Sequence, residues 1–165
     1  MKANKEFWDR WAGQYDRAMS RTGGLYEQIA MRIKKGLNRE MYVLELACGT
    51  GLLSEKLVGR VKLLEATDFS EAMIRQAKAK NYSCRLFFSV QDAAALPYAD
   101  FSFDAVVIAN ALHIMPQPEL ALAEIRRVLK PGGTLYAPTF VNGRGLGFRL
   151  RAGIMALGVN ADLKL

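Results

Sequence analysis

The stretch Val43-Leu-Glu-Leu-Ala-Cys-Gly-Thr-Gly-Leu-Leu53 decides the fold of this chain. It begins as an apolar strand that contains one carboxylate, Glu45, and it turns at Gly49 and Gly51 into a segment with helical spacing. A strand, a glycine turn and a helix start bring backbone N–H groups close to a bound molecule. Asp68 follows about twenty residues later, which is the spacing of nucleotide-binding folds. The stretch therefore predicts a ligand site at the end of a strand.

The composition predicts one domain with its own core. The chain has 165 residues, of which 51% are hydrophobic, and a chain of this size can bury a core. No opening segment resembles a signal peptide, and no window approaches the roughly 20 apolar residues that span a bilayer. We therefore expect a cytoplasmic protein without stable membrane insertion. Cys48 and Cys84 lie on or beside apolar strands, and with a single histidine the sequence predicts no metal cluster.

The net charge of +7 is concentrated at the two ends of the chain. Residues 1–40 carry nine Lys/Arg against five Asp/Glu, residues 41–140 carry ten of each, and residues 141–165 carry four against one. Solvated helix faces are the plainer interpretation, and attraction of an anionic substrate or membrane surface is the alternative. The sequence shows no basic stripe with interleaved aromatic residues, so we expect no nucleic-acid partner.

Strands and helices alternate along the chain. After the quoted strand, further apolar strands are expected over 61–67, 85–90, 103–109 and 134–140. Ser70 is the predicted N-cap of the helix that follows the second strand, and Pro118 precedes a helix expected over 120–129. Five strands that alternate with helices predict a parallel sheet covered by helices on both faces.

Helices are also expected near both ends, over 6–19, 25–37 and 143–158. The first of these carries an aromatic face that includes Trp8, Trp11 and Tyr15. Such a face is typical of a core helix, and a cover for the ligand site is the alternative.

Polar residues follow the ends of four expected strands, where parallel sheets bind their ligands. These residues are Cys48 to Gly51, Asp68, Asp92, and Asn110 with His113. Asp68 stands where a carboxylate accepts hydrogen bonds from ribose hydroxyls. Asp92 could accept the exocyclic amino group of adenine, and a carboxylate that only caps its own loop is the alternative. The position of Asp68 therefore predicts a nucleoside ligand.

NAD is the alternative nucleotide. Its fingerprint has a third glycine at the position where Ser54 stands. Glu45 would also place a negative charge near the NAD pyrophosphate. A ligand whose other end carries an amino group and a sulfonium suits this acidic turn better.

The run V-L-E-L-A-C-G-T-G resembles the first motif of the class I S-adenosylmethionine-dependent methyltransferases. Further similar stretches are A-T-D-F-S-E-A-M-I (66–74), Asp92-Ala93 with L-P-Y-A-D-F-S-F-D-A-V (96–106), and E-I-R-R-V-L-K-P-G-G-T-L (124–135). Together, over residues 8–140, they look most like the small-molecule branch that contains the ubiquinone and menaquinone biosynthesis enzymes. Ala47 replaces a residue that is often glycine in this motif, so we expect the turn there to avoid positive φ.

The resemblance implies a Rossmann-like, doubly wound parallel α/β sheet of about five strands in the order 3-2-1-4-5. It implies one domain over 1–165, in which 1–40 cover the cofactor, 41–140 form the cofactor-binding core and 141–165 end in a helix. The full fold has strands 6 and 7 as a hairpin beside the fifth strand, and we expect both to be missing here. The open edge would be covered by the tail, a partner or a second copy. A truncated chain that forms a homodimer is our expectation.

The resemblance also implies which residues bind the cofactor. They are Tyr15, Glu45, Ala47, Cys48, Gly49, Gly51, Asp68, Phe69, Met73, Asp92, Ala93 and Asn110. Glu45 and the glycine turn surround the methionine end, over which Tyr15 closes. Phe69 and Met73 flank the adenine, and Asn110 lies beside the methyl donor.

The implied cofactor is S-adenosyl-L-methionine, with S-adenosyl-L-homocysteine as product. The implied reaction moves a methyl group to oxygen, nitrogen or carbon of a small-molecule acceptor by in-line displacement. His113 is the candidate catalytic base, and packing beneath the cofactor loop is its alternative role. A non-catalytic cofactor-binding module that acts through a partner chain is the alternative function.

Overall fold

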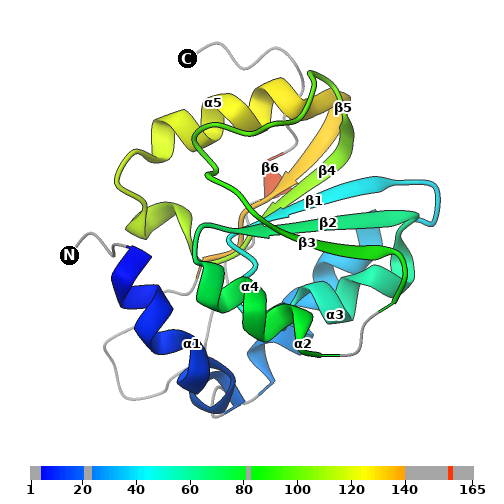
Figure 1. The fold of residues 1–165 in the computed structure, drawn as a ribbon. Helices are drawn as coiled ribbons and strands as arrows, with labels where there is room; N and C mark the ends of the chain where they lie inside the picture. Colours follow the sequence, from blue (N-terminus) through cyan, green and yellow to red (C-terminus); the bar gives the residue numbers. More distant parts are fainter. Residues whose placement is uncertain (1–4, 21–23, 81–82, 140–155, 158–165) are drawn as a thin grey trace, which may run out of the picture.

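A computed structural model of the chain describes residues 5–20, 24–80, 83–139 and 156–157. Figure 1 shows a central twisted sheet with helices on both of its faces. No helix in this described part combines the length and the apolar character that crossing a bilayer requires.

The sheet has the strand order β3-β2-β1-β4-β5-β6. The strands are β1 Tyr42–Leu46, β2 Leu63–Asp68, β3 Leu86–Val90, β4 Phe103–Ile108, β5 Leu129–Tyr136 and β6 Ala156–Leu157. The first five are parallel to one another, and β6 runs antiparallel to β5. This arrangement confirms the predicted doubly wound sheet with the order 3-2-1-4-5. The direction of winding reverses between β1 and β4, where such sheets bind ligands.

The α-helices and 3-10 helices surround this sheet. They are α1 Lys5–Ser20, α2 Leu25–Ile33, α3 Ser54–Leu57, α4 Glu71–Lys78, α5 Pro118–Val128, η1 Lys34–Gly36, η2 Val58–Arg60 and η3 Leu112–Ile114. The hydroxyl of Ser70 accepts the backbone N–H of Met73 at 3.1 Å, so Ser70 is the N-cap that the sequence predicted for α4. Pro118 occupies the first turn of α5, where its missing N–H has no helical partner to lose.

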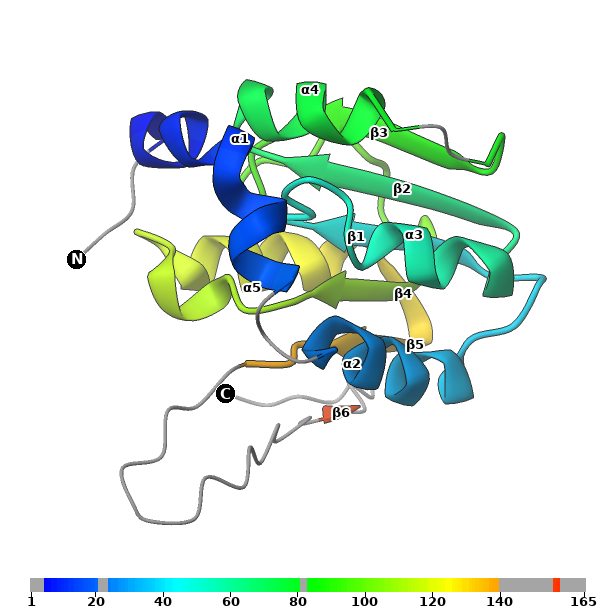
Figure 2. The same ribbon diagram turned by 90° about the horizontal axis from the view of Figure 1, so that it is seen from below.

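Two apolar cores lie on opposite faces of the sheet because side chains alternate along each strand. Val43 of β1 belongs to the core beneath α2 and α3. Leu44 and Leu46 belong to the second core, beneath α5. Figure 2 shows α2 and α3 on one face and α5 behind the other. The central strands β1 and β4 are therefore buried on both faces, as their apolar sequences predicted, whereas Phe87 and Val90 of the edge strand β3 are exposed.

The N-terminal helix does not contribute its aromatic face to either core. Ala12 is the one buried residue among those described in α1, while Phe7 and Trp11 are 38% and 41% exposed. The rings of Phe7, Trp8 and Trp11 contact one another at the surface instead. The core interpretation of this face is therefore wrong, and α1 packs against α4 near the carboxyl ends of the strands.

The last parallel strand begins earlier than predicted, directly after α5. Phe103 of β4 pairs with Leu129, and Ala105 pairs with Thr134, so the residues between them form an irregularity in β5. Gly132 lies there with φ +77°. The Lys-Pro-Gly-Gly sequence at 130–133, which lies between the helix expected over 120–129 and the strand expected over 134–140, is thus a bulge within β5.

The C-terminal expectations are only partly open to comparison. Most of the helix expected over 143–158 lies outside the described residues, but Ala156 and Leu157 within that range are a short strand rather than helix. They pair with Tyr136 and Leu135. The edge of β5 is therefore covered at two positions by the chain's own tail, because its exposed N–H and C=O groups accept a strand there.

Candidate cofactor-binding site

The glycine turn after β1 is built from three residues with positive φ: Ala47 at +51°, Gly49 at +57° and Gly51 at +81°. The prediction that Ala47 avoids positive φ is therefore wrong. Cys48 explains why, since its N–H donates to the carbonyl of Thr67 on β2 at 2.9 Å and so holds the turn against the neighbouring strand. This long-range hydrogen bond forces a conformation that alanine alone disfavours.

The carboxyl group of Glu45 lies fully inside the protein, directly beneath this turn. Its side chain is 1% exposed, and the hydroxyl of Ser54 donates to its Oε2 at 2.5 Å. Burial, with a smaller contribution from the negative charge of Asp68, raises the pKa of Glu45 to about 8. The Ser54 position that breaks the dinucleotide fingerprint thus holds the buried carboxyl group.

The carboxylate of Asp68, at the end of β2, points to the same turn. Its Oδ2 accepts the backbone N–H of Gly49 at 2.8 Å, and its Oδ1 accepts that of Ser70 at 2.8 Å. Burial raises its pKa although both hydrogen bonds favour the charged form. Each carboxylate oxygen can accept a second hydrogen bond, so ribose hydroxyls remain possible partners.

The ring of Tyr15 on α1 covers the glycine turn. A Cβ atom at Gly49 would lie 3.6 Å from Cε1 of Tyr15, so the ring stands in ordinary contact distance of this turn. The Tyr15 hydroxyl shares a 2.8 Å hydrogen bond with the hydroxyl of Tyr26 on α2. Burial raises the pKa of both phenols. Both N-terminal helices therefore contribute to the cover over the site.

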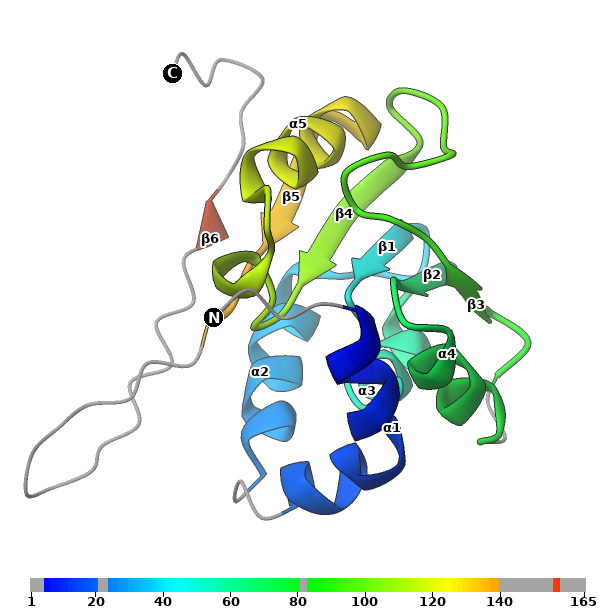
Figure 3. The same ribbon diagram turned by 60° about the vertical axis from the view of Figure 1, so that its left-hand side comes forward.

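Two carboxylates of α1 attach this cover to the segments that follow β1 and β2. Figure 3 shows the ribbon of α1 beside that of α4, near the ends of the strands. Asp9 accepts the hydroxyl of Ser70 at 2.5 Å and the N–H of Ala72 at 3.3 Å. Asp16 accepts the hydroxyl of Thr50 and pairs with Lys80 at 2.7 Å. The sequence prediction missed both aspartates. Their spacing of seven residues, which places them on one helical face, was the available signal.

The remaining predicted cofactor residues differ in how far their side chains are exposed. Phe69 is 52% exposed, whereas Met73 is 1% exposed and lies in the core under α4. Asp92 is exposed, and its Oδ1 accepts the N–H of Ala94 at 2.9 Å. Ala93 packs partly against the core beneath α5.

Three further predicted residues lie at the ends of β1 and β4. The thiol of Cys48 is buried, which raises its pKa. Asn110 has φ +54°, and its N–H donates to the carbonyl of Pro138 at 2.7 Å. His113 is exposed on η3.

A cavity of about 380 Å³ lies at the other edge of the sheet, near the amino ends of β4 and β5. It is lined by Asp100, Phe101, Ala123, Arg126, Arg127, Leu129, Lys130 and Pro131. None of the predicted cofactor residues is among them. Within the described ranges, no group of three or more His, Cys, Asp or Glu residues has the arrangement of a metal site.

The residues at the turn fit a ligand that carries a ribose and a cationic end. The carboxyl group of Glu45 is buried and that of Asp68 is half-buried, and neither forms an ion pair within the described part of the chain. Burial raises the pKa of both groups, so their charged forms are disfavoured until a positive partner approaches. A sulfonium or ammonium group near the turn would supply that neutralising charge.

Comparison with known proteins gives this geometry a family. Residues 44–137 match the model described as a methyltransferase domain. The demethylmenaquinone methyltransferase of Renibacterium salmoninarum is 43% identical over 98 residues, which cover 59% of this chain and 40% of that protein. The ubiquinone/menaquinone biosynthesis C-methyltransferase UbiE of Klebsiella pneumoniae is 36% identical over 112 residues, which cover 64% of this chain and 45% of that protein.

Among solved structures, a SAM-dependent methyltransferase from Thermotoga maritima superposes with a TM-score of 0.67 at 27% identity. The match covers 81% of this chain and 60% of that one. This chain thus spans less than half the length of each of the two sequence relatives, and 60% of the length of the Thermotoga protein. It belongs to the class I S-adenosylmethionine-dependent methyltransferases.

Proposed function

We propose that this chain binds S-adenosylmethionine at the glycine turn and transfers its methyl group to a small-molecule acceptor. The observation that supports this most directly is the pair of carboxyl groups at one turn beneath Tyr15: Glu45 is buried, and the half-buried Asp68 accepts the N–H of Gly49. The ligand of the family has the two groups that these residues suit, a ribose and a positively charged methionine end.

In this proposal, Asp68 holds the ribose hydroxyls while Glu45 and the N–H groups of the turn hold the methionine end. Phe69 offers its exposed ring as a stacking surface for the adenine. Asp92 and Ala93, which follow β3, hold the adenine edge. Met73 supports this surface from within the core rather than by contact, since its side chain is buried.

The chemistry of the bound cofactor is an activated methyl group on sulfur. The acceptor nucleophile forms a bond to the methyl carbon while the carbon–sulfur bond breaks, which leaves S-adenosylhomocysteine. The protein's task is to align the two partners and to exclude water. The α1 cover, held by Asp9 and Asp16, is suited to both.

We further propose that the acceptor is small and apolar. The ring of Trp8 lies 6.3 Å from that of Tyr15, centroid to centroid, and 5.1 Å from that of Phe7. These rings extend from the cover of the turn to the exposed end of α1. The Renibacterium relative is named for demethylmenaquinone and the Klebsiella relative for ubiquinone and menaquinone biosynthesis, and quinones have an apolar ring system.

Titration calorimetry tests the cofactor assignment. We expect micromolar binding of S-adenosylmethionine and S-adenosylhomocysteine, no binding of NAD, and at least a tenfold loss of affinity in Asp68→Asn, because a charge-assisted hydrogen bond is worth roughly 1.5–3 kcal/mol. Asp104→Asn is the matched control, because Asp104 lies at the amino end of β4, away from the turn. Preference for NAD would refute the assignment. A screen of acceptors that detects S-adenosylhomocysteine then tests for catalysis.

His113 is the proposed general base for an acceptor that must lose a proton, such as a phenol or enol. It is exposed on η3, just past the end of β4. For such an acceptor, His113→Gln should lower kcat by about a hundredfold at neutral pH with little change in KM. Equal turnover of both forms would assign the proton to solvent.

A further inference from the structure

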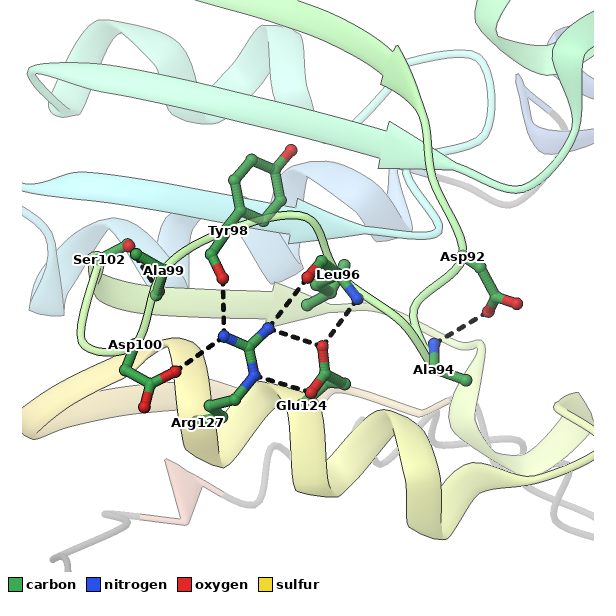
Figure 4. A network of polar contacts seen from close by, with 9 residues as sticks. All are labelled: Asp92, Ala94, Leu96, Tyr98, Ala99, Asp100, Ser102, Glu124 and Arg127. Carbon is green, nitrogen blue, oxygen red and sulfur yellow. Dashed lines mark hydrogen bonds and ion pairs between the residues drawn. The ribbon is translucent and has the colours of Figure 1, made fainter.

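The loop that joins β3 to β4 is bound to α5 by two charged side chains, as Figure 4 shows. Glu124 and Arg127 are three positions apart on α5, so both side chains face the loop. The Oε2 of Glu124 accepts the N–H of Leu96 at 2.7 Å, and Nη2 of Arg127 donates to the carbonyl of Leu96 at 3.0 Å. Both backbone polar groups of Leu96 are therefore held by one ion pair.

The guanidinium of Arg127 extends this attachment along the loop. Its Nη1 donates to the carbonyl of Tyr98 at 2.6 Å and to Oδ1 of Asp100 at 2.9 Å. Its Nε and Nη2 donate to the two oxygens of Glu124 at 2.8 and 2.7 Å. These hydrogen bonds lower the pKa of Glu124 and raise that of Arg127. Only the planar fork of arginine supplies donors in so many directions at once.

The attached loop begins with the carboxylate proposed to bind adenine. Asp92 closes a short turn in which its Oδ1 accepts the N–H of Ala94 and its carbonyl accepts the N–H of Ala95 at 3.1 Å. The next residue is Leu96, whose two backbone groups α5 holds and whose side chain is buried in the core beneath α5. Figure 4 shows the second oxygen of Asp92 directed away from the turn. The position of this oxygen thus depends on the residue that α5 anchors.

We propose that Glu124 and Arg127 are positioning residues for the cofactor. They fix Leu96 and thereby hold the turn at Asp92 where its carboxylate meets the amino group of adenine. This inference rests on the proposed function, in which Asp92 binds the adenine edge. It assigns a role to the conspicuous L-P-Y-A-D and E-I-R-R-V-L stretches, which contribute no side chain to the glycine turn.

The test compares two ligands that differ only at the adenine edge. S-inosylhomocysteine carries a carbonyl oxygen where S-adenosylhomocysteine carries the amino group, so a carboxylate at Asp92 repels the first and binds the second. We expect the native protein to prefer the adenosyl ligand, and Arg127→Met to reduce this preference about tenfold, the value of one hydrogen bond between charged and neutral groups. Arg127→Lys should reduce it as well, because one ammonium cannot reach both Leu96 and Tyr98.

The readout is the ratio of two dissociation constants measured by calorimetry on the same preparation. A variant that is partly unfolded changes both constants equally, so the ratio reports position and not stability. Lys130→Met is the matched control, because it breaks a 2.7 Å ion pair near the same helix end, and the partner in that pair, Asp104, belongs to β4 rather than to the loop. The control should keep the native ratio.

The possible failures are distinguishable. If the native protein binds neither ligand, the proposed function fails and this inference fails with it. If Asp92→Ala keeps the native preference, the adenine role of Asp92 is wrong and so is the inference. If Asp92→Ala loses the preference while both Arg127 variants retain it, the cofactor assignment stands and the positioning role alone is overturned.

Discussion

The turn after β1 stores backbone strain at one alanine. Ala47 adopts φ +51°, in a region where a Cβ atom is crowded by its own backbone. Alanine is tolerated there because the neighbouring Cys48 N–H is bound to β2. Glycine would adopt the same conformation without that crowding.

We therefore expect Ala47→Gly to stabilise the protein by about 0.5–1 kcal/mol, because relief of the left-handed strain exceeds the added entropy of the unfolded chain. Urea unfolding measures the difference. Ala79→Gly is the control, since Ala79 is exposed with φ −70° and gains nothing from glycine. It should be destabilised by up to about 1 kcal/mol. Equal effects at the two positions would contradict the strain argument.

The buried carboxyl group of Glu45 makes stability depend on pH. Its pKa is about 8 in the folded protein, against 4.5 ordinarily, so between these values the folded state keeps a proton that the unfolded chain has lost. The free energy of unfolding should therefore fall as pH rises from 4.5 to 8, by up to about 1.4 kcal/mol per pH unit from this group. Below that window the contribution is constant.

Urea unfolding at pH 5, 6, 7 and 8 tests this for the native protein and for Glu45→Gln, whose amide can still accept the Ser54 hydroxyl. In Glu45→Gln, the free energy of unfolding should fall less steeply with rising pH than in the native protein. Glu55→Gln, which removes an exposed carboxylate on α3, controls for the change of net charge. A slope that survives in Glu45→Gln would assign the pH dependence to other groups.

The α1 helix is held to the sheet by polar contacts more than by burial. Ala12 is its one buried residue in the described part, whereas Asp9 and Asp16 reach the loops after β2 and β1. The hydrogen bond from Ser70 lowers the pKa of Asp9. A helix attached in this way can open without disturbing either core. This property suits a cover over a site that must admit and release ligands.

We expect Asp9→Ala to increase amide hydrogen exchange in α1 by roughly tenfold, since it removes the hydrogen bonds to Ser70 and Ala72. Exchange in β1 should stay unchanged. Arg10→Ala is the control, because the Arg10 side chain donates to the backbone carbonyl of Glu6 within its own helix. Faster exchange throughout the sheet in Asp9→Ala would show that α1 is part of the global folding unit instead.

Contacts across the whole molecule join α2 to the edge of the sheet. The turn η1 after α2 ends at Gly36, and a Cβ atom there would lie 2.0 Å from the hydroxyl and 3.2 Å from Cζ of Tyr136 on β5. These two residues are a hundred positions apart in the chain. The close approach fixes how the N-terminal helices sit on β5 and hence over the turn.

Gly36→Ala should lower the free energy of unfolding by about 1–3 kcal/mol, because the Tyr136 ring must shift to admit the methyl group. Tyr136→Phe should recover part of this loss, since it removes the nearest atom. Gly59→Ala is the matched control in η2, where an added Cβ meets nothing within 4 Å. A double-mutant cycle without coupling between positions 36 and 136 would contradict this packing.

The association expected from an open β5 edge is also a property of the whole molecule. The pairing of Ala156 and Leu157 with β5 occupies two positions of that edge. A second copy would compete with this pairing, so dimerisation by strand addition remains a proposal. Light scattering across a concentration series distinguishes it from a single chain.

Residues of the candidate site could be predicted from the sequence where a polar or glycine residue lies in or directly after a predicted strand. The glycine turn, Glu45 and Asp68 were predicted from the sequence, and the structure brings them together. Asp9, Asp16 and Tyr26 were missed as parts of the cover. The seven-residue spacing of the two aspartates places them on one helical face, but it does not identify the residues that they contact. Met73 was predicted as a ligand contact, but helical periodicity places it equally well in the core, where it lies.

The sequence by itself determined the strand and helix alternation and the N-cap at Ser70, because hydrophobic period and capping are local rules. The strand order was expected only from the resemblance of its motifs to a known family. The tertiary structure alone decided the left-handed Ala47, the bulge in β5 and the attachment of α1. Each of these depends on hydrogen bonds or pairings between segments far apart in the chain. Such pairings exist only once the sheet has assembled, and no local pattern encodes them.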